Sequence, residues 1–123
     1  MAKRYILILD AGTSGPRCLI LDNNCKPVGY SKNKWVHTKE RNVPSFARAF
    51  DITSTKKSIA TLIKKSIQSA GISNREIAAV SVTSQRLGIV FLDKSGIELY
   101  GGPNLDLRAV FEGASIDEQM GNR

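Results

Sequence analysis

The stretch YILILDAGTSGPRCLIL, residues 5–21, decides the fold that this sequence predicts. It contains two apolar runs, at 5–9 and 18–21, with a polar segment of Asp, Gly, Thr and Ser residues between them. Short apolar runs are typical of strands that are buried on both faces, and turn-forming residues between two strands favour a hairpin. We therefore expect two buried strands joined by a polar turn.

The following segments extend this hairpin into a three-strand meander. Near-alternating apolar positions predict a third, half-exposed strand over residues 27–35, after a second turn at 22–24. Strands that are joined by turns this short pair antiparallel. Residues 36–50 are predicted to be a loop.

An amphipathic helix is the clearest single element in the sequence. Asp51 is a suitable N-cap, the apolar face runs to about Ala70, and Gly71 follows where a left-handed cap is expected. A helix of this length suits a crossover connection between parallel strands. The apolar segment Ile77–Val82 is therefore expected to be a fourth, buried strand.

A second hairpin and a short helix complete the predicted elements. The hairpin comprises 88–92 and 97–100, and an irregular helix is expected over about 107–120. The predicted fold class is α/β, with a mixed sheet made of an antiparallel three-strand meander, a crossover helix and a parallel fourth strand, plus the extra hairpin.

Composition places the chain among ordinary globular domains. Its 123 residues are 41% hydrophobic and 24% charged, which excludes a disordered or collagen-like chain. No apolar run approaches the roughly 20 residues of a membrane span. Cys18, Cys25 and a single histidine predict neither a disulfide framework nor a zinc site. We expect a cytoplasmic protein with no membrane partner.

Positive charge gathers in the first part of the chain. Residues 1–75 contain 14 Lys or Arg against 4 Asp or Glu, a balance of +10, whereas residues 76–123 have a balance of −3. A basic segment suits nucleic acid or an anionic ligand. Because the lysines are dispersed and lack an aromatic stacking pattern, a solvated surface is the favoured interpretation, and nucleic acid is not the expected partner.

The polar turn has the chemistry of a phosphate site. Gly12 and Gly15 let backbone N–H groups approach an anion. Thr13 and Ser14 add hydroxyl donors, and Arg17 adds a permanent positive charge. The same residue types are ordinary in turns, so composition leaves a phosphate loop and a plain polar hairpin about equally open.

Asp10 ends the first strand, where its carboxylate could hold a hydrated magnesium ion. The turn leads into a strand and carries no Gly-Lys-Ser/Thr sequence, so it is not a Walker A loop. It also lacks the third glycine of a dinucleotide fingerprint. A phosphate would thus be held by a β-hairpin.

Three motifs occur in order along the chain. They are Asp-x-Gly-Thr-Ser-x-x-Arg at 10–17, IAAVSVTSQR at 77–86 and PNLDLR at 103–108. The first resembles the leading phosphate motif of the actin-like ATPase superfamily. Together the three resemble the N-terminal end of the FGGY carbohydrate kinases, the family of glycerol kinase and xylulokinase, over about residues 4–109.

The resemblance implies a ribonuclease H-like (actin-like ATPase) subdomain of an ATP-dependent sugar or polyol kinase. Asp10 would hold Mg²⁺ near the transferred phosphoryl group, and the turn would cradle the phosphates of ATP. The implied cofactor-binding residues are Asp10, Gly12, Thr13, Ser14 and Arg17.

The implied substrate-binding residues are Gln85, Arg86, Asp106 and Arg108. Gln85 and Arg86 would border the sugar pocket, and Asp106 would contact the hydroxyl groups of the substrate. Plainer interpretations stay open. Gln85 and Arg86 could be a polar strand end, and Asp106 and Arg108 could be a surface ion pair.

Two positions depart from the family's pattern. Leu87 stands where glycerol kinases have glutamate and xylulokinases have histidine, and Asn104 stands where tryptophan is usual. Both changes argue against glycerol and xylulose as the substrate, and they leave the phosphate motif intact.

The resemblance also implies how the chain is organised. Residues 1–109 would be the N-terminal part of the first of two kinase domains, and residues 110–123 would begin a truncated helical segment. The catalytic base is expected beyond Arg123, so we assign no catalytic residue and expect the chain alone to be inactive. The intact enzyme would transfer the γ-phosphoryl group of MgATP to a hydroxyl of a small polyhydroxy substrate.

Two other classes of function stay open. The basic segment could make the chain a non-enzymatic module that binds anions or nucleic acid. Alternatively, the chain could be an interaction fragment that completes a partner chain. In that case it would expose apolar sheet surface, through which we expect self-association.

Overall fold

The computed structural model describes residues 4–38 and 43–121. Its strands and helices, in chain order, are β1 (Tyr5–Gly12), β2 (Gly15–Leu21), β3 (Pro27–Lys32), β4 (His37–Thr38), β5 (Ala49–Phe50), α1 (Ile52–Ala70), the 3₁₀ turn η1 (Asn74–Glu76), β6 (Ile77–Ser84), β7 (Ile89–Leu92), β8 (Glu98–Gly102) and α2 (Val110–Met120).

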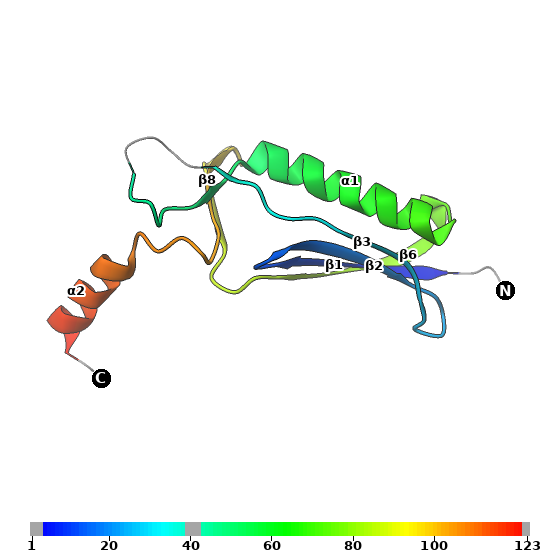
Figure 1. The fold of residues 1–123 in the computed structure, drawn as a ribbon, viewed down its shortest axis with the longest axis horizontal. Helices are drawn as coiled ribbons and strands as arrows, with labels where there is room; N and C mark the ends of the chain where they lie inside the picture. The colour runs from blue at the N-terminus through cyan, green and yellow to red at the C-terminus, as the bar shows by residue number, and fades with distance from the viewer. Residues whose placement is uncertain (1–3, 39–42, 122–123) are drawn as a thin grey trace.

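A four-stranded mixed sheet forms the body of the molecule, and its strand order is β3-β2-β1-β6. β1 pairs antiparallel with β2, and β2 pairs antiparallel with β3, which is the predicted meander. β6 lies parallel to β1, as the crossover through α1 requires. The predicted mixed α/β fold is confirmed, and Figure 1 shows α1 lying along one side of the sheet.

Local signals fix both ends of α1 as predicted. The Asp51 carboxylate accepts a hydrogen bond of 2.8 Å from the Ser54 amide, which satisfies a free N–H of the first turn. Gly71 adopts a left-handed conformation with φ of 65° and ends the helix.

The core lies between α1 and the sheet. Leu7, Cys18 and Leu62 form a buried cluster there. Ser66 is fully buried beside them, where its hydroxyl group donates to the Cys18 carbonyl oxygen at 3.1 Å and lies 2.6 Å from the Ser31 hydroxyl. A Cβ atom on Gly29 would lie 2.4 Å from the Ser66 carbonyl oxygen, so only glycine allows this approach of helix to strand.

The expectation of strands buried on both faces is wrong. Leu7 is 3% exposed but its neighbour Ile6 is 41% exposed, because Leu7 packs with Leu62 of α1 whereas Ile6 points to the opposite face of the sheet. The burial expected for β6 is also wrong, since Val80 and Val82 are 63% and 65% exposed. β6 is an edge strand of the described sheet, and α1 packs over β2 and β3 rather than over it.

The remaining predictions of elements hold with shifted boundaries. β3 ends at Lys32, and two short paired strands, β4 and β5, occupy part of the predicted loop, of which residues 39–42 lie outside the described residues. The second hairpin is confirmed as β7 and β8. α2 starts at Val110 and projects away from the sheet (Figure 1). Within the described ranges, no helix is long and apolar enough to cross a membrane.

Candidate functional site

The turn between β1 and β2 carries the predicted phosphate residues. β1 ends at Gly12 and β2 begins at Gly15, so Thr13 and Ser14 form the tip of the hairpin. Gly15 has φ of +140°, and a Cβ atom there would lie 2.1 Å from the carbonyl oxygen of Asn33. The turn therefore needs glycine at this position, because its backbone packs directly against the chain that follows β3.

Trp35 holds the other side of the same turn. Its indole Nε1 donates a 2.7 Å hydrogen bond to the Gly12 carbonyl oxygen, and its ring packs edge-on against Phe50 with centroids 5.1 Å apart. Sequence reasoning missed this role, since nothing local to Trp35 shows that its partner lies 23 residues earlier. The backbone of the turn is fixed by residues outside the motif.

Asp10 and Arg17 face each other across the hairpin. They are cross-strand partners, and one Arg17 guanidinium nitrogen lies 2.9 Å from an Asp10 carboxylate oxygen. The two side chains are 30% and 52% exposed, so the pair contributes at most about 1 kcal/mol to folding. Its effect is to orient both groups at the open end of the sheet.

The residues around Asp10 fit one hydrated magnesium ion and no dedicated metal cage. Among residues 4–38 and 43–121 there is no group of three or more His, Cys, Asp or Glu side chains that could hold a metal. Mg²⁺ bound with a nucleotide is commonly held by one or two carboxylates, with water and phosphate oxygens as its other ligands. The single Asp10 carboxylate beside the polar turn matches that pattern.

Asn104 links the hairpin turn to Gln85, one of the predicted sugar-binding residues. Its amide Nδ2 donates to the Thr13 hydroxyl at 2.8 Å, and its backbone N–H donates to Gln85 Oε1 at 3.2 Å. The backbone N–H of Gln85 in turn donates to the Ala11 carbonyl oxygen at 3.0 Å. Three motifs that are far apart in the sequence thus meet at one end of the sheet.

Arg86 and Leu87 follow Gln85 but do not join this network. Arg86 is exposed, and no hydrogen bond or ion pair of its side chain is found within the described part of the chain. Leu87 is 90% exposed and has φ of +61°, an uncommon conformation for a residue other than glycine. This tight turn presents both side chains to solvent.

Asp106 and Arg108 form an ion pair, as the plainer interpretation allows, and the carboxylate is partly buried. The two Arg108 nitrogens Nε and Nη2 lie 3.0 and 2.7 Å from Asp106 Oδ2, whose side chain is only 11% exposed. Asp106 also accepts a hydrogen bond from the Tyr100 hydroxyl. The Arg108 bonds, followed by that of Tyr100, hold the pKa of the Asp106 carboxyl well below its usual range against the opposing effect of burial.

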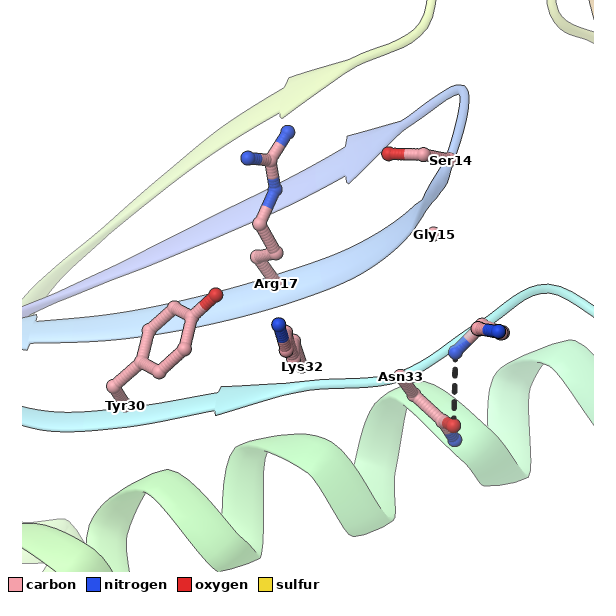
Figure 2. A pocket seen from close by; sticks show the side chains of 7 residues that line it. Ser14, Gly15, Arg17, Tyr30, Lys32 and Asn33 are labelled. Atoms are coloured by element: carbon pink, nitrogen blue, oxygen red, sulfur yellow. Dashed lines mark hydrogen bonds between the residues drawn. The ribbon is translucent and has the colours of Figure 1, made fainter.

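A basic cavity of about 440 Å³ adjoins the turn. Ser14 and Arg17 line it from the hairpin, and Lys32 and Lys34 line it from β3 and the segment that follows. Figure 2 shows Arg17 rising from β2 and Tyr30 rising from β3 around this space, whereas Asn33 points toward α1. The cavity has the sign of charge that binds an anion.

These features define the class of the protein: a ribonuclease H-like α/β unit of the actin-like ATPase fold, with a polar hairpin at the end of its sheet. Residues 5–103 match the N-terminal domain of the FGGY family of carbohydrate kinases. The chain belongs to this family.

The relatives in sequence include two autoinducer-2 kinases. That of Klebsiella pneumoniae is 33% identical over 114 residues, which are 93% of this chain and 21% of the relative. That of Salmonella typhimurium is 33% identical over 118 residues, which are 96% of this chain and 22% of the relative. The chain therefore spans about a fifth of the length of these relatives.

Solved kinase structures share the fold. Gluconate kinase from Lactobacillus acidophilus superimposes with a TM-score of 0.79 at 19% identity, over 97% of this chain and 23% of that one. A xylulose kinase from Brucella ovis gives a TM-score of 0.78 at 24% identity, over 95% and 24% of the two chains. At these identities the likeness shows the architecture alone.

The Asp106 cluster generates a prediction about pH. Because the pKa of Asp106 is lowered in the folded chain, its ionised form stabilises the fold above the ordinary carboxyl pKa of 3.8, and this stabilisation is lost as the pH falls below that value. The melting temperature of the Asp106→Asn variant should therefore fall less steeply than that of the unchanged chain as the pH is lowered from about 4 to about 2. The measurement is thermal unfolding by circular dichroism across that range.

The control for this prediction is Asp117→Asn, which removes an exposed carboxylate on α2. It should follow the acid dependence of the unchanged chain. If Asp106→Asn follows it too, the proposed coupling of Asp106 to folding is contradicted.

Proposed function

We propose that this chain supplies the phosphate-binding and sugar-contacting part of an ATP-dependent sugar or polyol kinase. The observation that carries the proposal is the hydrogen bond of 2.8 Å from Asn104 to Thr13. It joins the segment assigned to the sugar with the turn assigned to ATP, and a kinase must hold its acceptor next to the transferred phosphate. The reaction would move the γ-phosphoryl group of MgATP to a hydroxyl of a small polyhydroxy substrate.

The turn would act by position and charge. Phosphoryl transfer depends almost entirely on holding the reactants in line and stabilising negative charge. The backbone amides of Gly12, Thr13 and Ser14, with the hydroxyls of the last two, would donate to phosphate oxygens. Arg17 would add positive charge beside them, and Asp10 would hold Mg²⁺, which neutralises phosphate charge when it is bound.

Gln85 and Asp106 would serve the acceptor in different ways. The backbone N–H of Gln85 donates to the Ala11 carbonyl oxygen, and its side-chain Oε1 accepts from the Asn104 backbone N–H, so the side-chain amide would stand close to the reacting end of the site. Asp106 already accepts bonds from Arg108 and Tyr100, so it would contact a sugar hydroxyl only as part of that cluster. Arg86 is exposed, so its side chain is the least constrained of the four predicted residues, and it would have to turn toward the sugar to contact it.

The chemical class of the acceptor is proposed from the relatives and from two positions that differ from the family's pattern. The similar proteins are autoinducer-2 kinases, so a small oxygen-rich acceptor of that kind is a candidate here. Leu87 removes a polar contact that glycerol and xylulose kinases are expected to make, and Asn104 puts a polar amide where an aromatic ring is usual. We propose that the reaction takes place in the cytoplasm, with ATP as its phosphoryl donor.

The chain by itself should have little or no kinase activity. It spans about a fifth of its relatives, and a phosphoryl-transfer site needs charge and contacts from all sides of the phosphates. We propose that the catalytic base lies outside residues 1–123 and that none of the residues named above abstracts the proton of the acceptor hydroxyl.

Asp10→Ala tests the magnesium role. In the protein expressed from its whole reading frame, ATP-dependent phosphorylation of a panel of sugars and polyols should fall at least about a hundredfold, because charge stabilisation at the phosphates is lost. The measurement is ADP release coupled to an optical assay, with folding checked by circular dichroism.

Asp117→Ala, on exposed α2, is the matched control and should keep full activity. Retention of full turnover by Asp10→Ala would exclude the magnesium role. Absence of phosphorylation with every acceptor in the unchanged protein would exclude the proposed function itself.

One observation favours a second candidate, an interaction fragment that completes a partner chain. Val80 and Val82 on edge strand β6 are 63% and 65% exposed, and open apolar strand edges pair readily with another strand. We expect the purified chain to self-associate as its concentration rises, which static light scattering measures. A monomer at millimolar concentration would contradict this candidate.

A further inference from the structure

Three cations face the basic cavity beside the hairpin. In the register of the sheet, Arg17 pairs with Asp10 on one side and with Lys32 on the other. Lys34 lies two residues beyond Lys32 and lines the same cavity. Figure 2 shows this space over β2 and β3.

Within residues 4–38 and 43–121, Arg17 is the one of these three charges that has an ionic partner. Asp10 pairs with Arg17, while neither lysine forms an ion pair in the part of the chain that the structure describes. Arg17 and Lys32 are like charges directly opposite each other on neighbouring strands, an arrangement that destabilises a sheet. A bound anion would remove that repulsion.

The backbone that carries the lysines is fixed relative to the turn. The Asn33 amide donates to the Pro16 carbonyl oxygen at 3.0 Å, and the Asn33 side chain donates to the Ser58 hydroxyl on α1 at 3.1 Å. The approach of Gly15 to the Asn33 carbonyl group locks the same segment from the hairpin side. The backbone from which the two lysine side chains extend is therefore held in place before any ligand binds.

We propose that Lys32 and Lys34 form, with Arg17 and the Ser14 hydroxyl, an anion subsite for a polyphosphate chain. Lys32 and Lys34 lie outside the phosphate motif. The identification of this anion as the triphosphate of a nucleotide rests on the proposed function. The subsite itself is inferred from the cavity and the charges that line it. A cavity of about 440 Å³ with three cations suits several linked phosphates.

The experiment titrates the 123-residue chain with inorganic tripolyphosphate by isothermal calorimetry. Lys32→Gln/Lys34→Gln should weaken binding at least about tenfold, since each charge-assisted hydrogen bond to phosphate is strong. The matched control is Lys57→Gln/Lys65→Gln, which removes the same charge from the exposed side of α1 and should lower affinity less than about threefold.

A second readout separates ligand binding from a structural role. Because the replacement of Lys32 removes a like-charge pair, the double variant should melt at the same temperature as the unchanged chain or higher, while it binds more weakly. A lower melting temperature together with weaker binding would indicate a structural role and overturn the proposal. Lys32→Arg/Lys34→Arg should keep most of the affinity.

Other outcomes are equally decisive. Equal losses in the two glutamine variants would show a response to net charge alone and overturn the subsite, as would an absence of tripolyphosphate binding by the unchanged chain. If the subsite fails in this way while the whole protein phosphorylates a sugar, the proposed function stands. If tripolyphosphate binding depends on Lys32 and Lys34 but no acceptor is phosphorylated, the anion subsite stands and the proposed function fails.

Discussion

The contact between Gly15 and the Asn33 carbonyl group is the constraint on which the site depends. With a Cβ only 2.1 Å from that oxygen, no other residue fits, so the hairpin turn lies flat against the segment after β3. This contact places Lys32, Lys34 and Trp35 around the turn. The indole of Trp35 then fixes the Gly12 carbonyl group, which leaves the amides of the turn as the groups available to a ligand.

A second set of bonds brings the distant motifs to the same place. Asn104 reaches Thr13 across 91 residues, and Gln85 bonds both Asn104 and Ala11. Asp106 is held close by through Arg108 and Tyr100, so the sugar segment has a rigid base. The turn assigned to ATP and Gln85, one of the residues assigned to the acceptor, are thus parts of one hydrogen-bonded network, and Asp106 belongs to a second cluster with Arg108 and Tyr100.

Local features of the sequence could predict most elements of the fold. Asp51 and Gly71 cap α1 through contacts within a few residues, and such signals are visible in the chain order. Burial could not be predicted in the same way. The apolar run of β6 is compatible with a central strand, but exposure depends on what packs against it, and α1 covers β2 and β3 instead.

The candidate site could be predicted only in part, because its local features are visible in the sequence and its long-range contacts are not. The turn residues occur next to each other, so their chemistry is visible in the sequence. Trp35 and Asn104 act through partners 23 and 91 residues away, and Asn104 stands out only as a departure from a family pattern. Lys32 and Lys34 resemble any other surface lysines until the strand register places Lys32 opposite Arg17 and the cavity brings Lys34 to the same space.

The central claim is that the hairpin of residues 12–15 receives the phosphates of ATP. Its most direct test is a titration of the ¹⁵N-labelled chain with MgATP, followed by amide chemical shifts. The account predicts that the largest shifts occur at Gly12, Thr13 and Ser14, with smaller ones at Lys32 and Lys34. Saturable binding that leaves these five amides unmoved would contradict it.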